Sequence, residues 1–323
     1  MKKIALTTGD PAGIGPEVVL KALSSPVFPD CLPIVIGDFC VVEAALRTLG
    51  SPLTIEAIDS PDDISPSPGK VLLIDMKSLQ SFQQNMPDAG NGRAVVGYIK
   101  KAAGLAIERK VDAVVTAPIS KEAMKLAGFP WPGHTEMLAE LTGAGEYAMM
   151  LVGGPLRVVL ATTHTAIIRV PALITRERVL KTIRLAKKAA EMLGIVKPRI
   201  AVAGLNPHAG ESGIFGREEM EAIRPAIVDA GGEGITAEGP YPPDNIFYKA
   251  YRGGVDIVVC MYHDQGLIPL KMIAFDTGVN VTVGLPIIRT SPDHGTAFDI
   301  AWKGMADPSS MIEAVRLACM LKL

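Results

Sequence analysis

Short runs of β-branched and other apolar residues alternate along the whole chain with longer segments of helical periodicity. The runs with strand composition are 3–8, 33–38, 70–75, 112–118, 156–164, 199–204 and 256–263. Because these runs are apolar at successive positions, they predict strands that are covered on both faces. The segments 92–110 and 176–193 show the spacing of amphipathic helices, and the second has Val179, Ile183 and Ala186 on one face. This alternation predicts an α/β fold with a largely parallel sheet.

Composition and charge indicate which partners to expect. The 323 residues are 48% hydrophobic, which is enough to bury two moderate cores, and we expect two domains. Lys and Arg number 32 against 34 Asp and Glu, so we expect no binding to nucleic acid or to an anionic membrane. No apolar run approaches the roughly 18 residues of a membrane span, and the stretch after Lys3 is too short for a signal peptide. Small molecules are the expected partners.

The cysteines indicate the redox environment. Cys31, Cys40, Cys260 and Cys319 are scattered without a C-x-x-C pair, and three of them lie in apolar stretches. This usage predicts reduced thiols in a cytoplasmic protein, and neither a disulfide framework nor a thiolate metal site.

A glycine-rich turn, "GDPAGIGPE", follows the first predicted strand. It is not a P-loop, because Gly15 is followed by Pro16 and Glu17 where Lys and Ser or Thr are required. It is not a dinucleotide fingerprint either, because its glycines are spaced G-x-x-x-G-x-G. Pro16 and Glu17 are ordinary residues for the start of a helix. We therefore favour a structural turn. A turn that lines a functional site is supported only by the general rule that functional residues lie at the carboxyl ends of strands.

Three of the five histidines directly follow predicted strands: His164, His208 and His263. Because the carboxyl ends of parallel strands lie at the same edge of a sheet, these imidazoles could converge on a divalent metal. Imidazole nitrogen favours zinc, cobalt, nickel or iron over magnesium. The residues alone leave a second interpretation open, in which each histidine is separately hydrogen-bonded at a strand end.

Residues suited to anions follow His263. Lys271, Asn280 and Arg289 lie in or beside apolar runs. A guanidinium offers a planar set of donors to phosphate or carboxylate, and an ammonium offers a point charge. A phosphate is therefore a plausible ligand, although both cations could instead reach the surface or pair with a local carboxylate.

Six motifs, taken together, resemble one known family. They are "GDPAGIGPE", "GHTEML", "LATTH", "GLNPHAGE", "MYHDQGLIPLK" and "GLPIIRTSPDHGTAFDIA". In this order, from Thr8 to about Asp307, they resemble 4-hydroxythreonine-4-phosphate dehydrogenase, the NAD-dependent enzyme family of pyridoxal 5'-phosphate biosynthesis. The chain departs from the usual family residues at Asn245, which is more often Thr, and at Trp302, a position that is often small.

The segment "HGTAFDIAWKGMADP", 294–308, is also similar to the adenosine-binding loop of isocitrate and isopropylmalate dehydrogenases. This similarity implies that NAD or NADP is held around His294, Gly295 and Thr296, and not by the opening glycine turn. The fold that it implies is not Rossmann-like, but has two α/β/α domains flanking a cleft.

The resemblance also implies domain boundaries. Residues 1–125 and 275–323 would form one α/β domain, which carries the NAD loop. Residues 126–274 would form a central α/β domain, which carries most metal and substrate ligands and the dimer interface.

Position by position, the family's functional residues fall on matching motifs of this chain. The implied ligands of a divalent metal (Zn, Co, Mn or Mg) are His164, His208 and His263. The implied substrate contacts are His134, Thr135, Lys271, Asn280 and Arg289. The implied catalytic residues are Asp244 and Lys271, although a metal-bound water could equally accept the hydroxyl proton. In the family both subunits of a dimer supply metal ligands, so a homodimer with its active site at the subunit interface is expected.

The implied reaction is oxidation of 4-phosphohydroxy-L-threonine at its C3 hydroxyl, followed by decarboxylation to 3-amino-2-oxopropyl phosphate. The metal would lower the pKa of the hydroxyl, and the protein would position substrate and cofactor. Relatives that act on 4-phosphoerythronate or threonate share the same frame and remain an alternative. A non-redox phosphate acyltransferase of similar fold, or a binding protein without catalysis, would lack NADH formation.

Overall fold

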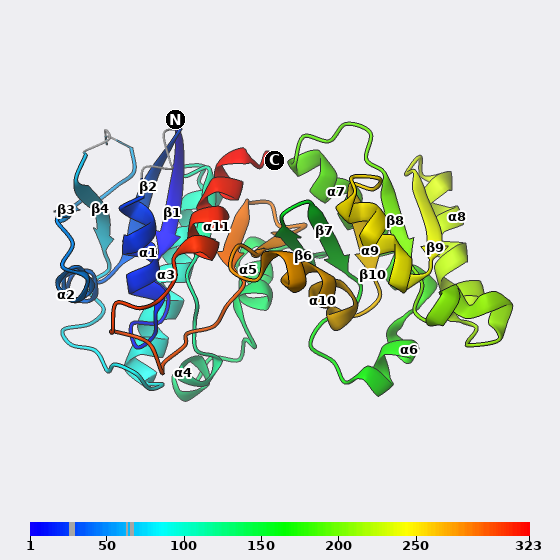
Figure 1. Ribbon diagram of the computed structural model, residues 1–323. Helices are drawn as coiled ribbons and strands as arrows, with labels where there is room; N and C mark the ends of the chain where they lie inside the picture. Colours follow the sequence, from blue (N-terminus) through cyan, green and yellow to red (C-terminus); the bar gives the residue numbers. More distant parts are fainter. Residues whose placement is uncertain (26–29, 63, 65–67) are drawn as a thin grey trace. The chain divides into compact units, whose positions relative to one another are not determined.

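Figure 1 shows the computed structural model of the chain, which describes residues 1–25, 30–62, 64 and 68–323. The chain divides into two compact units, each described here by itself. Unit 1 comprises Met1–Gly145 and Leu285–Leu321 with Leu323, and unit 2 comprises Glu146–Gly284 with Lys322. His134 and Thr135 thus belong to unit 1 and Asn280 to unit 2, while the domain boundaries implied by the resemblance stay a prediction.

The strands of unit 1 form a parallel sheet. They are β1 (Lys2–Thr7), β2 (Cys31–Gly37), β3 (Thr54–Ala57), β4 (Lys70–Asp75), β5 (Ala113–Thr116) and β12 (Arg289–Pro292). Their order is β3-β4-β2-β1-β5-β12, and each neighbouring pair is parallel. Thr7 lies beside Thr116 where β1 and β5 end, so the opening glycine turn begins at the carboxyl edge of this sheet.

Helices cover both faces of this sheet. They are α1 (Gly15–Leu23), α2 (Phe39–Leu49), α3 (Ala89–Ile107), α4 (Lys121–Leu126), α5 (His134–Thr142) and α11 (Ser309–Met320). In Figure 1, α1 and α11 lie in front of the strands and α3 lies behind them. Ile4, Ala5 and Leu6 of β1 have no exposed surface, as the apolar run predicts for a strand covered on both sides.

The sheet of unit 2 is mixed. Its strands are β6 (Ala148–Gly153), β7 (Leu156–Leu160), β8 (Ile200–Ala203), β9 (Ala237–Tyr241), β10 (Ile257–Cys260) and β11 (Val279–Val283). Their order is β11-β6-β7-β10-β8-β9, with β6 antiparallel to β11 and β7 and the other pairs parallel. The neighbours β7, β10 and β8 therefore end at the same edge of the sheet.

Helices α9 and α10 pack on one face of this sheet. The helical elements of unit 2 are η1 (Ile167–Arg169), α6 (Val170–Leu173), α7 (Arg176–Met192), η2 (Pro207–Gly213), the π-helix η3 (Glu219–Ile223), α8 (Arg224–Gly232), α9 (Pro243–Tyr251) and α10 (His263–Ala274). Ile246 of α9 and Leu270 of α10 join one buried cluster with Val158, Ala201 and Val258 of the strands. Helix α7 contacts β7, β8, β10 and β11.

The structure confirms the predicted α/β fold and its strand runs, which correspond to β1, β2, β4, β5, β7, β8 and β10. The helices predicted over 92–110 and 176–193 are α3 and α7. The strand pairing is largely parallel, as predicted. The exception is β6, which is antiparallel to β11 and, through a connection of only two residues, 154–155, forms an antiparallel hairpin with β7. The four cysteines are free thiols. Within the described part of the chain, no helix combines the length and apolarity needed to cross a membrane.

Candidate active site

A buried arginine lies at the start of β12 in unit 1. Arg289 is 2% exposed, and its Nη2 and Nε donate hydrogen bonds to Oγ1 of Thr116 over 2.7 and 3.1 Å. Burial lowers the pKa of the guanidinium to about 9, and the nearby carboxylate of Glu136 offsets part of that fall. An anion that binds beside this guanidinium would offset part of the unfavourable free energy of burying its charge.

His134 and Thr135 form the first turn of α5. Burial, and then the charge of Arg289, hold the pKa of His134 well below its usual value, so the ring is neutral near pH 7. Its Nε2 is buried and has no hydrogen-bond partner among the described residues. The first backbone N–H groups of α5, like those of any helix, have no intrahelical acceptor, and no side chain at the N-cap, Gly133, accepts from them. The cation, the helix N-terminus and the buried ring nitrogen together suit a phosphate or a carboxylate.

Two of the three strand-end histidines of unit 2 lie side by side. His164 follows β7 and His263 begins α10 directly after β10, and their ring centroids are 5.5 Å apart. Nδ1 of His263 lies 2.7 Å from Oδ1 of Asp264. This contact orients the ring and leaves Nε2 of His263 as its ligand nitrogen, an arrangement typical of metal-binding histidines.

His208 lies in η2, and its ring is 6.1 Å from that of Phe215. It does not complete a three-residue site within one chain, because the described residues contain no group of three His, Cys, Asp or Glu that could hold a metal ion. The backbone of His208 and Ala209 is left-handed, with φ of 51° and 53°. Since such a conformation costs roughly 1–2 kcal/mol per residue, this turn stores strain.

Glu219 of η3 organises the segment that carries His208. It is 1% exposed, and its Oε1 accepts hydrogen bonds from the backbone N–H groups of Leu205 and Asn206 over 2.8 and 2.7 Å. The side-chain amide of Asn206 donates to Oε2 over 2.9 Å. Sequence reasoning missed Glu219, because "REEME" reads as an exposed helix face.

The remaining predicted site residues of unit 2 lie on three elements. Lys271 lies on α10 with its Nζ 5.5 Å from the ring centroid of Phe275. Asn280 lies on β11, and its Oδ1 is buried without a hydrogen-bond partner among the described residues. Asp244 is exposed in the first turn of α9. Asn280 therefore offers a buried acceptor for a hydroxyl or ammonium donor, and Asp244 offers an accessible carboxylate.

His294, Gly295 and Thr296 follow β12 in unit 1. Gly295 is exposed, and a Cβ built on it would have no atom within 4 Å, so a ligand has room to approach its backbone. The carbonyl oxygen of Thr296 accepts a hydrogen bond from the backbone N–H of Ile14 over 2.9 Å. The opening glycine turn thus contacts the segment for which a cofactor role is predicted.

Asp10, in that same turn, is fully buried. Its Oδ1 accepts from the backbone N–H of Ala12 over 2.9 Å, while Oδ2 has no partner among the residues described. Burial raises the pKa of this carboxyl to about 6, partly offset by the backbone N–H groups of Ala12 and Ser120. The neutral acid is therefore the form that the fold favours.

This raised pKa predicts a pH-dependent stability. Between about pH 4 and 6 the native state binds more protons than the unfolded chain, so Asp10 lowers the free energy of unfolding as pH rises, by about 3 kcal/mol in all. Asp10→Asn keeps an acceptor for Ala12 but cannot titrate, and it is expected to lose correspondingly less stability over this window. Denaturant unfolding of both proteins at pH 4, 5, 6 and 7 measures the difference, and parallel curves would contradict it.

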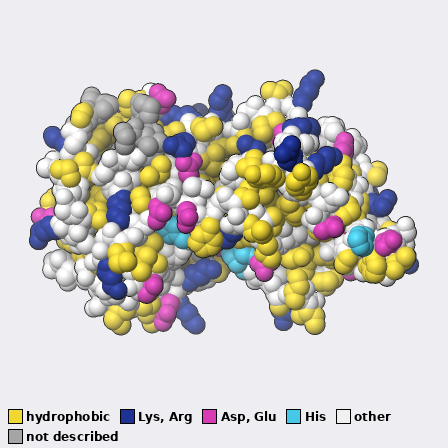
Figure 2. All heavy atoms as spheres, viewed as in Figure 1, with side chains coloured by type: hydrophobic (Ala, Val, Ile, Leu, Met, Phe, Trp, Pro, Cys, Tyr) yellow, Lys and Arg dark blue, Asp and Glu magenta, His cyan; other side chains and the backbone are white. Residues whose placement is uncertain are grey.

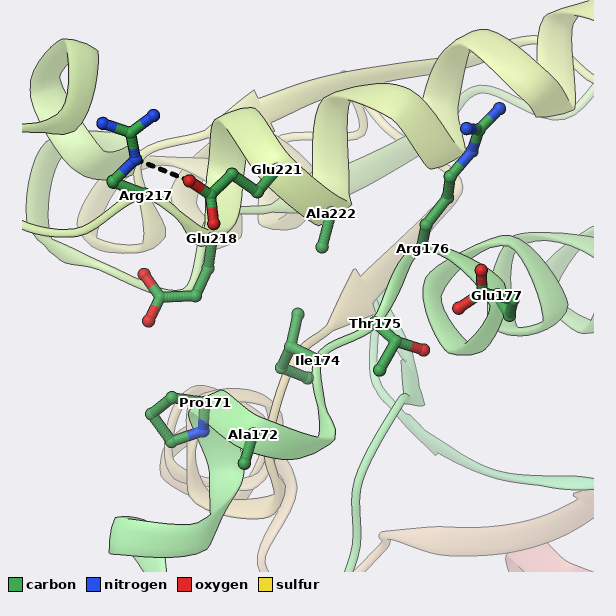
Figure 3. A pocket seen from close by; sticks show the side chains of 10 residues that line it. All are labelled: Pro171, Ala172, Ile174, Thr175, Arg176, Glu177, Arg217, Glu218, Glu221 and Ala222. Atoms are coloured by element: carbon green, nitrogen blue, oxygen red, sulfur yellow. Dashed lines mark hydrogen bonds and ion pairs between the residues drawn. The ribbon is translucent and has the colours of Figure 1, made fainter.

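A separate cavity of about 670 Å³ in unit 2 is drawn in Figure 3. Its cations are already engaged, since Arg217 donates to Glu221 and Arg176 donates to Asp229, each over 2.5 Å. None of the predicted site residues lines it. We therefore assign it no part in the chemistry.

Comparison with known proteins covers nearly the whole chain. A family model described as "Pyridoxal phosphate biosynthetic protein PdxA" matches residues 29–318. The 4-hydroxythreonine-4-phosphate dehydrogenase of Trichlorobacter lovleyi is 49% identical over 99% of this chain and 97% of its own length. The D-threonate 4-phosphate dehydrogenase of Cupriavidus necator is 47% identical over 97% of this chain and 95% of its own.

Solved structures agree with these matches. A crystal structure of a 4-hydroxythreonine-4-phosphate dehydrogenase from Burkholderia phymatum is 44% identical, with a TM-score of 0.90 over 100% of this chain and 99% of that chain. A β-decarboxylating dehydrogenase from Thermococcus kodakarensis is 18% identical, with a TM-score of 0.50 over 99% and 83%. The second likeness concerns the fold alone, and it confirms the predicted isocitrate dehydrogenase-like fold.

Proposed function

Since this chain belongs to the family of the pyridoxal phosphate biosynthetic protein PdxA, we propose that it oxidises 4-phosphohydroxy-L-threonine with NAD or NADP. Hydride passes from C3 to the nicotinamide while the hydroxyl proton is released. The resulting 2-amino-3-oxo acid loses CO2 and takes up one proton, which gives 3-amino-2-oxopropyl phosphate. The free cysteines fit a cytoplasmic location.

The observation that carries this proposal is the pairing of His164 and His263, whose rings lie 5.5 Å apart, with Asp264 orienting the second ring. Imidazoles held in this way fit a divalent ion such as zinc, cobalt or manganese. A divalent ion bound there would polarise the C3 oxygen of the substrate, both as the hydroxyl and as the C3 carbonyl of the β-keto acid that oxidation forms. Holding that ion in place is the role of the two histidines.

The phosphate of the substrate is assigned to the anion site of unit 1. Arg289 supplies charge and paired donors, and the first turn of α5, at His134 and Thr135, supplies backbone N–H groups. Lys271 and Asn280 are assigned to other polar atoms of the substrate. A phosphate held at several points fixes the C3 hydrogen toward the cofactor, which is the positioning part of catalysis.

NAD is assigned to the segment His294, Gly295 and Thr296. The open space beside Gly295 supports this assignment, because a cofactor can approach the backbone there. The nicotinamide ring of the bound cofactor would accept the hydride. The hydroxyl proton is assigned to Asp244 or Lys271, the two titratable side chains that the family motifs indicate.

We also propose that the chain acts as a homodimer that forms through α10. Ile268, Met272 and Phe275 are 61%, 82% and 71% exposed and follow one face of the helix, while Leu270 faces the core. Figure 2 shows hydrophobic side chains gathered over α9 and α10. A surface helix that is apolar on both faces is typical of an interface. A second copy would also supply His208 as the third ligand.

Met272→Asp is expected to convert the dimer to a monomer, because it introduces a charge into the apolar face. NADH formation is expected to fall with the dimer, since His208 comes from the partner in this arrangement. Light scattering gives the molar mass. The matched control is Val228→Asp, which changes a similarly exposed residue of α8 and should leave the mass unchanged. An unaltered mass for Met272→Asp would remove α10 from the interface.

The relative from Cupriavidus necator favours D-threonate 4-phosphate as a second candidate substrate. The two substrates differ at C2, which carries an ammonium in one and a hydroxyl in the other. Purified protein should be assayed with both in parallel, with NAD and with NADP, and the ratio of kcat/KM identifies the substrate. A ratio above about tenfold in favour of 4-phosphohydroxy-L-threonine supports the proposal, and the reverse ratio assigns the enzyme to the threonate.

A further inference from the structure

Glu17, in the first turn of α1, is a fully buried carboxylate that the proposed chemistry does not use. Its Oε2 accepts a hydrogen bond from the backbone N–H of Trp302 over 2.8 Å, and its Oε1 accepts from that of Gly304 over 2.6 Å. Each oxygen thus holds a different backbone donor, 285 and 287 residues away along the chain. The N-terminus of α1 stabilises the charge that makes both bonds strong.

Lys21, one turn further along α1, holds the same segment by its carbonyl groups. Its Nζ donates to the carbonyl oxygens of Gly304 and Ala306 over 2.8 and 2.5 Å. The helix therefore binds the N–H groups of residues 302 and 304 through one side chain, and the C=O groups of 304 and 306 through another. Because Glu17 and Lys21 are four residues apart, their side chains lie on one face of α1.

The turn before α1 holds the other end of the segment. The backbone N–H of Ile14 donates to the carbonyl oxygen of Thr296 over 2.9 Å. A Cβ at Gly13 would lie 2.8 Å from that oxygen, so the close approach requires glycine. The opening turn and α1 together fix the segment at 296 and at 302–306.

Trp302 needs this support. Its backbone is left-handed, with φ of 62°, which is unfavourable for a bulky residue. The bond from its N–H to Glu17 and the bond from its Nε1 to the carbonyl oxygen of Pro11, over 3.0 Å, hold it there. Its ring also packs against Phe82, with centroids 5.0 Å apart.

We propose that Glu17 is a positioning residue for the dinucleotide cofactor. The inference rests on the proposed NAD site, because it assigns to Glu17 the task of holding residues 296–304 in the shape that binds the cofactor. Glu17 touches neither substrate nor cofactor. Its loss should therefore weaken dinucleotide binding and leave the chemical step and the binding of the phosphorylated substrate nearly unchanged.

Glu17→Gln tests this directly. The amide has the shape of the carboxylate, but it presents one oxygen and one NH2 group, so one of the two backbone donors meets another donor. The Kd of NADH, measured by fluorescence titration, and the KM of NAD are expected to rise about tenfold. The kcat and the KM of the phosphorylated substrate are expected to stay within about twofold.

The matched control is Asp38→Asn. Asp38 is 1% exposed in the same unit, and its Oδ1 accepts from the backbone N–H groups of Ser78 and Leu79, which are not part of the cofactor segment. It should lower stability without changing the Kd of NADH. Equal weakening of NADH binding by both variants would show a general loss of stability and overturn the positioning role.

The remaining outcomes separate this inference from the function on which it rests. Absence of NADH binding by the wild-type protein overturns the proposed function, and the inference falls with it. Binding by the wild-type protein and equal binding by Glu17→Gln overturn the inference alone. Should Glu17→Gln not fold, Lys21→Met removes the bonds to Gly304 and Ala306 from a half-buried position. It is expected to raise the Kd of NADH about threefold, and an unchanged Kd contradicts the proposal.

Discussion

His263→Ala is expected to lower kcat for NADH formation by about a thousandfold. The variant removes one of two adjacent imidazoles proposed to hold a divalent ion, and a metal acting as a Lewis acid lowers the barrier by several kcal/mol. Initial rates at saturating substrate and NAD measure the loss. A kcat within twofold of the wild-type value would exclude His263 from the chemistry.

Asp264→Asn distinguishes the role of a metal ligand, His263, from that of a residue that only orients the ligand. Because Asp264 orients the ring of His263 and does not itself hold the ion in our proposal, metal affinity should fall about 10- to 100-fold. Activity of this variant should return when the metal concentration is raised. His263→Ala should not be rescued in the same titration.

A mixing experiment asks whether His208 acts across the dimer. His208→Ala and His263→Ala are each expected to be inactive. After subunit exchange, each mixed dimer would contain one site with both histidines intact, which should restore about a quarter of the wild-type activity. Activity that stays at the level of the separate variants would mean that both residues serve the same chain.

Arg289→Met is expected to raise the KM of the phosphorylated substrate about 100-fold, with a smaller effect on kcat. Arg289 is proposed to hold the phosphate, and losing a charge-assisted contact in a buried site costs about 2–5 kcal/mol. The same substitution removes a guanidinium whose pKa is lowered by burial, so the thermal midpoint should stay equal or rise. Reduced activity with raised stability is typical of a binding residue.

The matched measurement uses 4-hydroxy-L-threonine, which lacks the phosphate. If Arg289 binds that group, the wild-type protein should use this compound poorly, and Arg289→Met should use it no worse. An unchanged KM for the phosphorylated substrate, or an equal loss with both compounds, would show that the phosphate assignment is wrong.

The central strands of the fold were predictable because their sequences are apolar on both faces, as β1 and β10 illustrate. Two of the missed strands, β9 and β12, have a composition that does not suggest a strand. β12 reads Arg-Thr-Ser-Pro, and only its place beside β5 makes it a strand. β9 contains Gly and Pro, which an edge strand tolerates, and it lies at the end of its sheet.

The pairing of His164 and His263 illustrates what topology can predict. Both follow parallel strands that prove to be neighbours, β7 and β10, so the shared sheet edge brings their rings together. His208 follows β8, the next strand, but the left-handed turn that carries it depends on Glu219, eleven residues further along the chain. Strand position does not predict such a turn, because it depends on a buried carboxylate and specific backbone donors.

The opening glycine turn shows a different limit. Its spacing matches none of the known phosphate-binding loops, and Glu17 reads as an ordinary helix-start residue. Its partners, Trp302 and Gly304, lie near the other end of the chain, and they are backbone groups that carry no sequence signal. The contact of Gly13 with Thr296 could not be predicted from the sequence either, since any turn can contain glycine.

Metal-dependent oxidation at the paired histidines is tested most directly by NADH formation from 4-phosphohydroxy-L-threonine. The measurement uses metal-depleted protein, before and after one divalent ion is restored. We predict no NADH absorbance from the depleted protein, and a full return on adding zinc, cobalt or manganese to one ion per site. Near-normal turnover by the depleted protein, or product formed without NADH, would contradict metal-dependent oxidation at the paired histidines.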